Sequence, residues 1–399
     1  MSVATKGVFI VAAKRTPFGK MGGMFVNKTA TDLSVVASNA AIKEAGLKPE
    51  KIDSVIFGNV MSLTASDGIY MPRHVLLKCG IPLEKPALGV NRLCGSGFQS
   101  IVSGAQSIAV GESKIVLAGG AENMSQTPFV VRNVRFGTVL GQKFDFEDAL
   151  WVGLGDSYCN LPMGMTAEKL GAKYGVTREE VDKFALRSQQ LWKAANDGGH
   201  FKAEMAPVSM MVKKQQVDVA VDEHPRPETK IGDLSKLKSI FQKDGLVTAG
   251  TASGVCDGAG ALILASEDAV KSEGLTPFAR LVGYSIVGVE PSIMGIGPAP
   301  AIKNLLKTTG KTLNDIEIVE INEAFGAQTL ACAKDLSLDM NKLNVNGGAI
   351  ALGHPLAASG SRITAHIVHE LRRRNAGKFA IGSACIGGGQ GIAVMVEAL

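Results

Sequence analysis

The sequence lacks long apolar runs, closely paired cysteines and blocks of like charge, and each absence excludes a class of protein. No stretch reaches the roughly 18 uninterrupted apolar residues that a transmembrane helix needs, so we do not expect an integral membrane protein. The six cysteines are scattered over 399 residues without close metal-type pairs. This usage predicts buried free thiols in a reducing compartment, and neither a disulfide framework nor a metal site.

The charge is low as well. The formal net charge is +5, with acidic and basic residues interspersed, so no nucleic-acid partner is expected. A strand-like run begins already at Val8, which leaves no room for a cleavable signal peptide and makes secretion unexpected. A composition of 46% hydrophobic and 20% charged residues is typical of a globular protein with a sizeable core and roughly two or three domains.

What the sequence does contain is an internal repeat. Gly97, preceded by serine, leads into an apolar run that ends at Gly119, and Gly360, also preceded by serine, leads into a run that ends at Gly382. The spacing between the two glycines is 22 residues in both copies. Such a coincidence indicates that one unit occurs twice.

A third landmark lies at the same offset. The shift of 263 residues that relates the two copies also relates Asn59 to Asn322, and each asparagine ends an apolar run. This period is far longer than that of solenoid repeats, and it favours a duplicated domain. The alternative is that small residues at helix starts simply recur, as they do in many α/β proteins.

Apolar periodicity predicts alternating strands and helices, and therefore two α/β halves. The expected strands are Val8–Ala13, Ser54–Phe57, Ile115–Ala118, Ala259–Leu264, Ile316–Ile321, Lys378–Ile381 and Gly391–Val396. The expected helices are Thr31–Glu44, Gly97–Val110, Arg178–Ala195 and Gly360–Arg374. Residues 123–246 have fewer apolar runs and more Pro, Lys and Asp, so we interpret them as an inserted loop domain between an N-terminal half (1–122 plus 247–270) and a C-terminal half (271–399).

Cys94 is a candidate nucleophile. It lies where a loop meets the helix expected from Gly97, and the free N–H groups and positive dipole end of that helix would lower the thiol pKa below about 8.5. The neighbouring glycines would let a thioester approach and leave amides free for an oxyanion. The alternative is that Cys94 is a small buried apolar residue, as most free cysteines are.

Three residues of the second half could act with it. Cys385 precedes three glycines and suits an acid/base thiol, although a buried cysteine in a glycine turn is the simpler interpretation, and a phosphate loop is excluded because no Lys-Ser or Lys-Thr follows. His354 roughly mirrors Cys94 in the repeat and could accept its thiol proton, unless it is only a turn residue before proline. Asn322 could hold a water or a carbonyl, or else cap the next helix.

At this point the motifs resemble those of the thiolases over essentially the whole chain. The matching segments are Lys14–Gly19, Asn91–Ser96, Gly119–Ser125, Asn322–Phe325, Gly347–Pro355 and Cys385–Gly389. Within the family, the chain is most similar to the mitochondrial enzymes that cleave 3-ketoacyl-CoA in fatty-acid β-oxidation, as judged from Asn91–Cys94, Pro162–Glu168, Asp222–His224 and Gly387–Val394. The resemblance implies duplicated βαβαβαββ halves in a layered α/β/α/β/α core, with an inserted loop domain.

The resemblance also implies the chemistry. Cys94 would attack the keto carbonyl while His354 accepts its proton, Cys385 would protonate the departing acetyl-CoA carbanion, and CoA would then take the acyl group. One oxyanion site would consist of His354 and a water on Asn322, and the other of the N–H groups of Cys94 and Gly387. The same steps in reverse would condense two thioesters, with Cys385 as the base.

For CoA itself, the family pattern falls on Arg226 and Thr229 in the loop domain and on Ser253. The alternative for Arg226 is a solvated surface residue. CoA, 3-ketoacyl-CoA and acetyl-CoA are the implied partners, with no permanently bound cofactor and no metal. A homotetramer, formed as a dimer of dimers, and a mitochondrial matrix location with an uncleaved N-terminus are also implied.

Other functions remain open at this stage. An acetoacetyl-CoA thiolase is one alternative, although Pro162 stands where those enzymes typically carry histidine. A ketoacyl synthase would need a second histidine where this chain has Asn322 and Cys385. A non-catalytic thiolase-like protein would be expected to lack a catalytic group. After His354 the sequence departs from the family's glycine-rich pattern, because Leu356 is followed by two alanines.

Overall fold

One continuous sheet of eleven strands runs through the computed structural model, which describes residues 1–212, 214–375 and 378–399. Its strand order is β15-β16-β17-β14-β2-β13-β6-β4-β5, with β1 added to β14 and β3 to β13. The strands of this sheet are β1 (Ser2–Ala4), β2 (Val8–Arg15), β3 (Gly19–Lys20), β4 (Ser54–Gly58), β5 (Ala87–Val90), β6 (Ile115–Asn123), β13 (Cys256–Ser266), β14 (Ala279–Gly288), β15 (Ile316–Ile321), β16 (Phe379–Ile386) and β17 (Gln390–Ala398).

The helices and the short strands complete the element order. The α-helices are α1 (Ala30–Glu44), α2 (Met71–Lys78), α3 (Ser96–Ala109), α4 (Ala149–Gly153), α5 (Met163–Lys173), α6 (Arg178–Asp197), α7 (Ile231–Ser235), α8 (Glu267–Ser272), α9 (Pro298–Thr309), α10 (Gly326–Leu336), α11 (Ala349–Leu352) and α12 (Ala358–Arg374). The 3-10 helices are η1 (Pro49–Lys51), η2 (Gly68–Tyr70), η3 (Met124–Gln126), η4 (Pro291–Ile296) and η5 (Leu313–Asp315). The short strands are β7 (Phe129–Val130), β8 (Glu147–Asp148), β9 (Gly155–Asp156), β10 (Leu161–Pro162), β11 (Val208–Val212) and β12 (Gln215–Val219).

The sheet itself is duplicated. Outward from the middle, β14-β17-β16-β15 on one side corresponds to β2-β13-β6-β4 on the other, and in each set only the last pair is parallel. The two sets join through only two residue pairs, Ala279 with Ile10 and Arg280 with Phe9. The predicted pair of α/β halves is therefore confirmed, and all seven predicted strands are present.

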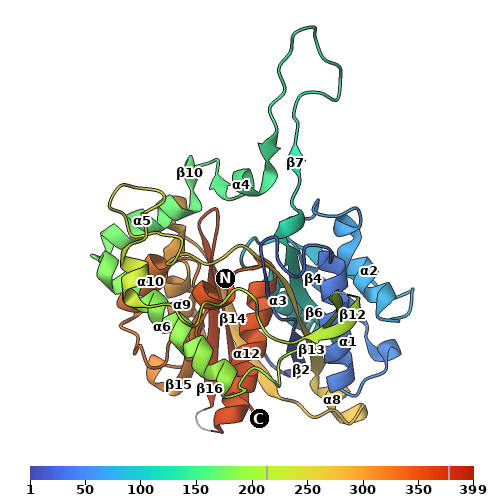
Figure 1. Cartoon of the computed structure of the whole chain (residues 1–399). Coiled ribbons are helices and arrows are strands. Elements are labelled where there is room, and N and C mark those ends of the chain that lie inside the picture. The colour runs from blue at the N-terminus through green and yellow to red at the C-terminus, as the bar shows by residue number, and fades with distance from the viewer. Residues whose placement is uncertain (213, 376–377) are drawn as a thin grey trace.

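The two central helices explain why the repeat contains glycine. Helix α3 of the first half and α12 of the second lie side by side between the halves (Figure 1). Their backbones meet where a Cβ on Gly97 would lie 2.6 Å from the carbonyl oxygen of Ala357, and a Cβ on Gly360 would collide with the backbone N of Phe98. Any side chain at either glycine would force the helices apart.

The remaining helices cover the outer faces. Helices α1 and α2 pack on β13, β6 and β4, and α9 packs on β17, β14 and β16. Thr29 and Thr177 begin α1 and α6 with capping boxes, in which each threonine side chain accepts a backbone N–H and an acidic residue three positions on accepts the threonine N–H. Helices α3 and α12 lie between the two halves of the sheet, so each half of the sheet forms a layer of its own. The layers therefore run helix, half-sheet, helix, half-sheet, helix, which confirms the predicted fold class.

The segment expected to be an inserted domain shares its core with the rest of the chain. Val181, Phe184 and Ala185 of α6 belong to the same apolar cluster as the buried residues of α9, β15 and α10. Between β7 and β8 the chain extends far from the body of the molecule (Figure 1). The two boundaries of this domain, near 123 and 246, stay predictions. In the described ranges, no helix is both long and apolar enough to cross a membrane.

Candidate active site

Cys94 lies on a strained turn at the start of α3. Leu93, just before it, adopts φ 45°, a left-handed conformation that bulky residues rarely adopt and that costs about 1–3 kcal/mol. Two hydrogen bonds close the turn, from the N–H of Gly95 to the carbonyl oxygen of Arg92 and from the N–H of Ser96 to that of Leu93, both at 2.9 Å. Strain of this kind persists where the surroundings fix the backbone. Here the two hydrogen bonds hold the turn, and with it the position of the Cys94 thiol.

The prediction that the helix start lowers the pKa of the Cys94 thiol is wrong. Burial raises the pKa of Cys94 to about 11, and the negative charge of Glu122 adds to the rise. The backbone N–H groups of Gly387 and of Cys94 itself donate toward the sulfur and lower the pKa, but by less than burial raises it. The helix start therefore does not generate a thiolate by itself, and Cys94 could act as a nucleophile only if a base removed its proton.

Cys385 lies on the second half of the repeat and faces the same point. It ends β16, is fully buried, and packs beside Met294 and Ala324. Burial raises its pKa well above the usual value, and Cys94 contributes to the rise. Gly387 follows in the β16–β17 turn, where a Cβ would lie 3.2 Å from the side chain of Leu93, so the turn after Cys385 contacts the turn that carries Cys94.

His354 enters the site on a glycine-dependent bend. Gly353 has φ 95°, and a Cβ there would collide with the sulfur of Cys256, so only glycine fits. The N–H of His354 donates to the carbonyl oxygen of Gly254 at 2.9 Å. These contacts fix the backbone beside the ring, which is itself buried.

The imidazole of His354 has two polar neighbours. Its Nδ1 lies 2.6 Å from the hydroxyl oxygen of Ser359, and the side-chain nitrogen of Asn322 lies 3.3 Å from Nε2 and 3.4 Å from Nδ1. Burial, and then the positive charge of Arg362, lower the pKa of His354 to about 3. The ring is therefore neutral near pH 7 and can accept a proton. The Asn322 side-chain oxygen is buried without a hydrogen-bond partner among the described residues, which leaves it available to a water or a ligand.

Apolar side chains line the space beside Cys94. Leu356, at which the sequence departs from the glycine-rich pattern of the thiolases, is buried in the cluster that packs against Cys94. Met124 and Leu150 complete the buried part of that cluster, and Leu150 comes from the predicted loop domain. The loops that carry Cys94 and His354 thus meet through Leu356, at the crossing of α3 and α12.

The residues expected to bind CoA divide into two places. Ser253 adjoins the loop that follows Asn322, since its N–H and hydroxyl both donate to the carbonyl oxygen of Ala324, at 3.0 and 3.1 Å. Arg226 and Thr229 form a separate turn, in which the Thr229 hydroxyl donates to the Arg226 carbonyl oxygen at 2.7 Å. The Arg226 side chain is exposed, and its N–H donates to the side-chain oxygen of Gln189 on α6.

His224 connects the turn of Arg226 and Thr229 to the segment just before His354. Its Nδ1 lies 2.7 Å from the carbonyl oxygen of Ala351, and its ring fills the space where a Cβ on Gly254 would lie. Burial lowers the pKa of His224, and the nearby positive charge of Arg226 lowers it further. The Arg226 turn is thus one side chain away from the loop that carries His354.

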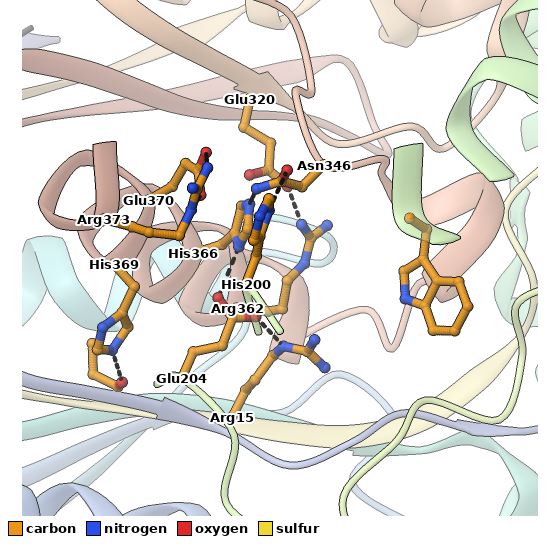
Figure 2. Close-up of polar contacts among 12 residues, drawn as sticks. Arg15, His200, Glu204, Glu320, Asn346, Arg362, His366, His369, Glu370 and Arg373 are labelled. Atoms are coloured by element: carbon orange, nitrogen blue, oxygen red, sulfur yellow. Dashed lines mark hydrogen bonds and ion pairs between the residues drawn. The ribbon is translucent and has the colours of Figure 1, made fainter. Parts of the chain in front are cut away.

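Buried ion pairs anchor the same segment to the core. The Arg15 guanidinium on β2 donates to Asp222 at 2.7 and 3.1 Å and to Glu204 at 2.5 Å. Figure 2 shows Glu204 between Arg15 and His366 of α12, whose Nδ1 lies 2.7 Å away. Breaking one partner of such a buried network is costly because the other charge stays desolvated, so the Arg226 turn has a fixed attachment to both halves.

Sequence reasoning missed one buried acid of the site. Glu122 accepts hydrogen bonds from the backbone N–H groups of Val60, Met61 and Ala357, and burial raises its pKa to about 7. It therefore fixes the apolar loop beside Cys94 to the start of α12. The repeat held the signal, because the shift of 263 residues relates Glu122 to Cys385.

Within the described ranges, no group of three or more His, Cys, Asp or Glu side chains is arranged to hold a metal ion. The chemistry available to the site is that of two thiols, a neutral imidazole, an amide and two convergent backbone N–H groups. Such a set suits acyl transfer through a cysteine thioester.

Comparisons with known proteins agree with this geometry. Residues 8–268 match the model of the thiolase N-terminal domain, and residues 275–398 match that of the thiolase C-terminal domain. The chain is 61% identical to the human protein named 3-ketoacyl-CoA thiolase, mitochondrial, over 98% of both chains. It superposes on the crystal structure of human mitochondrial 3-ketoacyl-CoA thiolase in complex with CoA with a TM-score of 0.96, at 61% identity and with 100% and 99% of the two chains covered. It superposes on the Bacillus anthracis acetyl-CoA acetyltransferase with a TM-score of 0.95, at 43% identity, covering 99% and 100%.

Proposed function

The chain belongs to the thiolase family, and from that premise we propose that it cleaves 3-ketoacyl-CoA with CoA, giving acetyl-CoA and a shortened acyl-CoA through an acyl-Cys94 intermediate. It is an acyltransferase, and the reaction class is that of the 3-ketoacyl-CoA thiolases of fatty-acid β-oxidation. The observation that carries the proposal is the contact between the two cysteine-bearing turns: Gly95, next to Cys94, packs so tightly on Ile386, next to Cys385, that a Cβ on Gly95 would lie 2.5 Å from the Ile386 side chain. One thiol can form the acyl-enzyme while the other handles the proton of the leaving acetyl-CoA.

Each group has a step that suits its environment. His354, kept neutral by burial and by Arg362, takes the proton of the Cys94 thiol as the sulfur attacks the keto carbonyl. Cleavage of the carbon–carbon bond leaves an acetyl-CoA carbanion, which receives the proton of Cys385. The thiol of CoA then gives its proton to the Cys385 thiolate and attacks the acyl-Cys94 thioester. Cys94 leaves as a thiolate and takes back its proton from His354, which releases the shortened acyl-CoA and restores all three groups.

Two oxyanion sites follow from the same contacts. The N–H groups of Cys94 and Gly387 lower the pKa of the Cys94 thiol, which supports them as the proposed donors to the oxygen of a thioester on that sulfur. The second site consists of His354 and a water on Asn322. Removing one donor of such a site typically lowers the rate by about two to three powers of ten.

Turnover on 3-ketoacyl-CoAs of graded chain length tests the proposed function. We expect thiolysis to extend to chains longer than acetoacetyl-CoA, because the side chains that pack around Cys94, which include Met124, Leu150 and Leu356, are apolar and suit an alkyl chain. Activity confined to acetoacetyl-CoA would favour the acetyl-CoA C-acetyltransferase alternative. Absence of turnover on every substrate would favour a non-catalytic binding protein.

CoA is the proposed co-substrate, bound through Ser253, Arg226 and Thr229. This assignment is supported by the exposed guanidinium of Arg226 on a turn one side chain from the catalytic loop, and a guanidinium suits phosphate recognition. The solved CoA complex of the 61% identical human enzyme agrees with CoA binding at a fold of this kind.

Arg226→Ala should raise the KM for CoA roughly threefold to tenfold with little change in kcat. The charge lies far from the bond that breaks, so it contributes binding shared by ground and transition states. Added salt should also weaken CoA binding less steeply in the variant. Initial rates at varied CoA and ionic strength measure both effects, and Lys236→Ala, which removes another exposed charge of the same domain, is the control. An unchanged KM with a lower Tm would identify Arg226 as a surface residue.

We further propose a homotetramer built as a dimer of dimers, located in the mitochondrial matrix. Two exposed features support self-association: the strand β5 at the end of the sheet, with Leu88 exposed, and the extended β7–β8 segment, with Phe136 and Leu140 almost fully exposed. The location is supported by the mitochondrial names of relatives about 60% identical. An uncleaved N-terminus stays a prediction.

A further inference from the structure

The imidazole of His354 contacts a serine that belongs to the internal repeat. Ser359 is fully buried at the start of α12, and its hydroxyl oxygen lies 2.6 Å from Nδ1 of His354. The same oxygen lies 3.1 Å from the carbonyl oxygen of Pro355. The hydroxyl thus has two polar neighbours and only one proton to share between them.

The hydrogen bonds of Ser359 indicate where that proton lies. The carbonyl oxygen of Pro355 can only accept, and it accepts the Ser359 hydroxyl as well as the backbone N–H groups of Ala358 and Ser359. With its proton on Pro355, the Ser359 oxygen accepts from His354, which requires a proton on Nδ1. In the reverse arrangement Ser359 would donate to the ring and its hydrogen bond to Pro355 would be lost.

The Asn322 contact does not choose between the tautomers, because its side-chain nitrogen lies 3.3 Å from Nε2 and 3.4 Å from Nδ1 of His354. The assignment therefore rests on the Ser359 contact at Nδ1. The ring is neutral, because burial and Arg362 disfavour the imidazolium, so it carries one proton in total. Arg362 itself lies one turn beyond Ser359 on α12, in a buried ion pair with Glu320 (Figure 2).

We propose that Ser359 is a positioning residue that holds His354 in the tautomer with its proton on Nδ1, so that the Nε2 lone pair is free to accept the thiol proton of Cys94. The proposal rests on the proposed function, in which His354 is the base. Only one of the two neutral tautomers can act as that base at Nε2, and the choice between them is made by the partner of Nδ1.

The repeat gives the serine a counterpart with a different use. Ser96, the equivalent residue of α3, donates to the carbonyl oxygen of Leu93 at 2.7 Å and accepts from the N–H of Arg92 at 2.9 Å. In the first half the hydroxyl therefore closes the turn that carries the nucleophile. In the second half it acts on the base instead.

Ser359→Ala should lower kcat roughly 10- to 100-fold with little change in KM, because the Nδ1 proton loses its acceptor and the Nε2-protonated tautomer becomes populated. Ser361→Ala is the matched control. It removes a buried hydroxyl from the same turn of α12, one that donates to the carbonyl oxygen of Ala358, and its kcat should stay near that of the parent. Ser359→Thr, which keeps the hydroxyl, should recover part of the rate where its added methyl is tolerated.

Nitrogen-15 NMR of histidine-labelled protein reads the tautomer directly. The chain has six histidines, so the His354 signals are identified by their loss in His354→Ala. We expect a protonated Nδ1 and a bare Nε2 in the parent and in Ser361→Ala, and a shift toward protonated Nε2 in Ser359→Ala. An Nε2-protonated ring in the parent, or an unchanged tautomer in Ser359→Ala, would overturn the proposal.

The His354→Ala variant separates this proposal from the function on which it rests. Full acylation of Cys94 in His354→Ala would contradict His354 as the base, and so the proposed function. If His354→Ala is impaired while Ser359→Ala matches Ser361→Ala in kcat, the base is correct and Ser359 does not position it.

Discussion

Replacing Cys94 by alanine should abolish thiolysis, lowering kcat by about four to six powers of ten, since no other group can form the acyl-enzyme. The effect should be far larger than any change in stability. Cys94 is a small side chain at the edge of an apolar cluster, and alanine fills most of its volume. Thioester hydrolysis, which needs the same covalent intermediate, should disappear together with thiolysis.

Peptide mass analysis after brief incubation with acetoacetyl-CoA locates the intermediate. The acyl group should be found on the peptide that contains Cys94 in the parent and nowhere in Cys94→Ala. Cys79→Ala, which truncates another buried free thiol in the first half, should keep both label and turnover. Label on Cys385 alone would reverse the two thiol assignments.

Cys385→Ala should separate proton transfer from covalent chemistry. The variant should lose exchange of the acetyl-CoA α-proton by about two to four powers of ten, the usual contribution of a positioned acid or base. Acylation of Cys94 by an acyl-CoA should persist at a reduced rate, because His354 and the N–H groups of Cys94 and Gly387 remain in place.

Deuterium loss from labelled acetyl-CoA and acylation monitored by mass measure the two steps separately. Exchange that persists equally in Cys94→Ala and Cys385→Ala would mean that neither thiol is the acid/base group. Loss of acylation in Cys385→Ala, with its Tm unchanged, would mean that Cys385 also takes part in forming the thioester.

The repeat made the fold readable from the sequence. Because α3 and α12 touch backbone to backbone, glycine is required at both Gly97 and Gly360, and the equal spacings to Gly119 and Gly382 mark the strands that follow. Strand β14 was not predicted, because Gly283 and Ser285 interrupt its apolar run. Its place was also hidden, since β14 joins the two halves through a pairing that no local pattern encodes.

The candidate site was less predictable, because its electrostatics depend on long-range packing. The residues around the two thiols could be named from their motifs, but the pKa of Cys94 could not. Its burial involves Leu150 and Leu356, which lie 56 and 262 residues away along the chain. Helix-terminus effects are local and visible in a sequence, whereas desolvation is not, and here desolvation has the larger effect.

The duplicated sheet also divides the proposed catalytic groups between its two copies. The shift of 263 residues pairs Cys94 with Ala357, His354 with Asn91 and Cys385 with Glu122, whereas Asn322 is paired with an identical residue, Asn59. The proposed nucleophile therefore comes from one copy and the proposed base and acid from the other. Neither half alone holds the complete set, so we expect the two halves to work only as one chain.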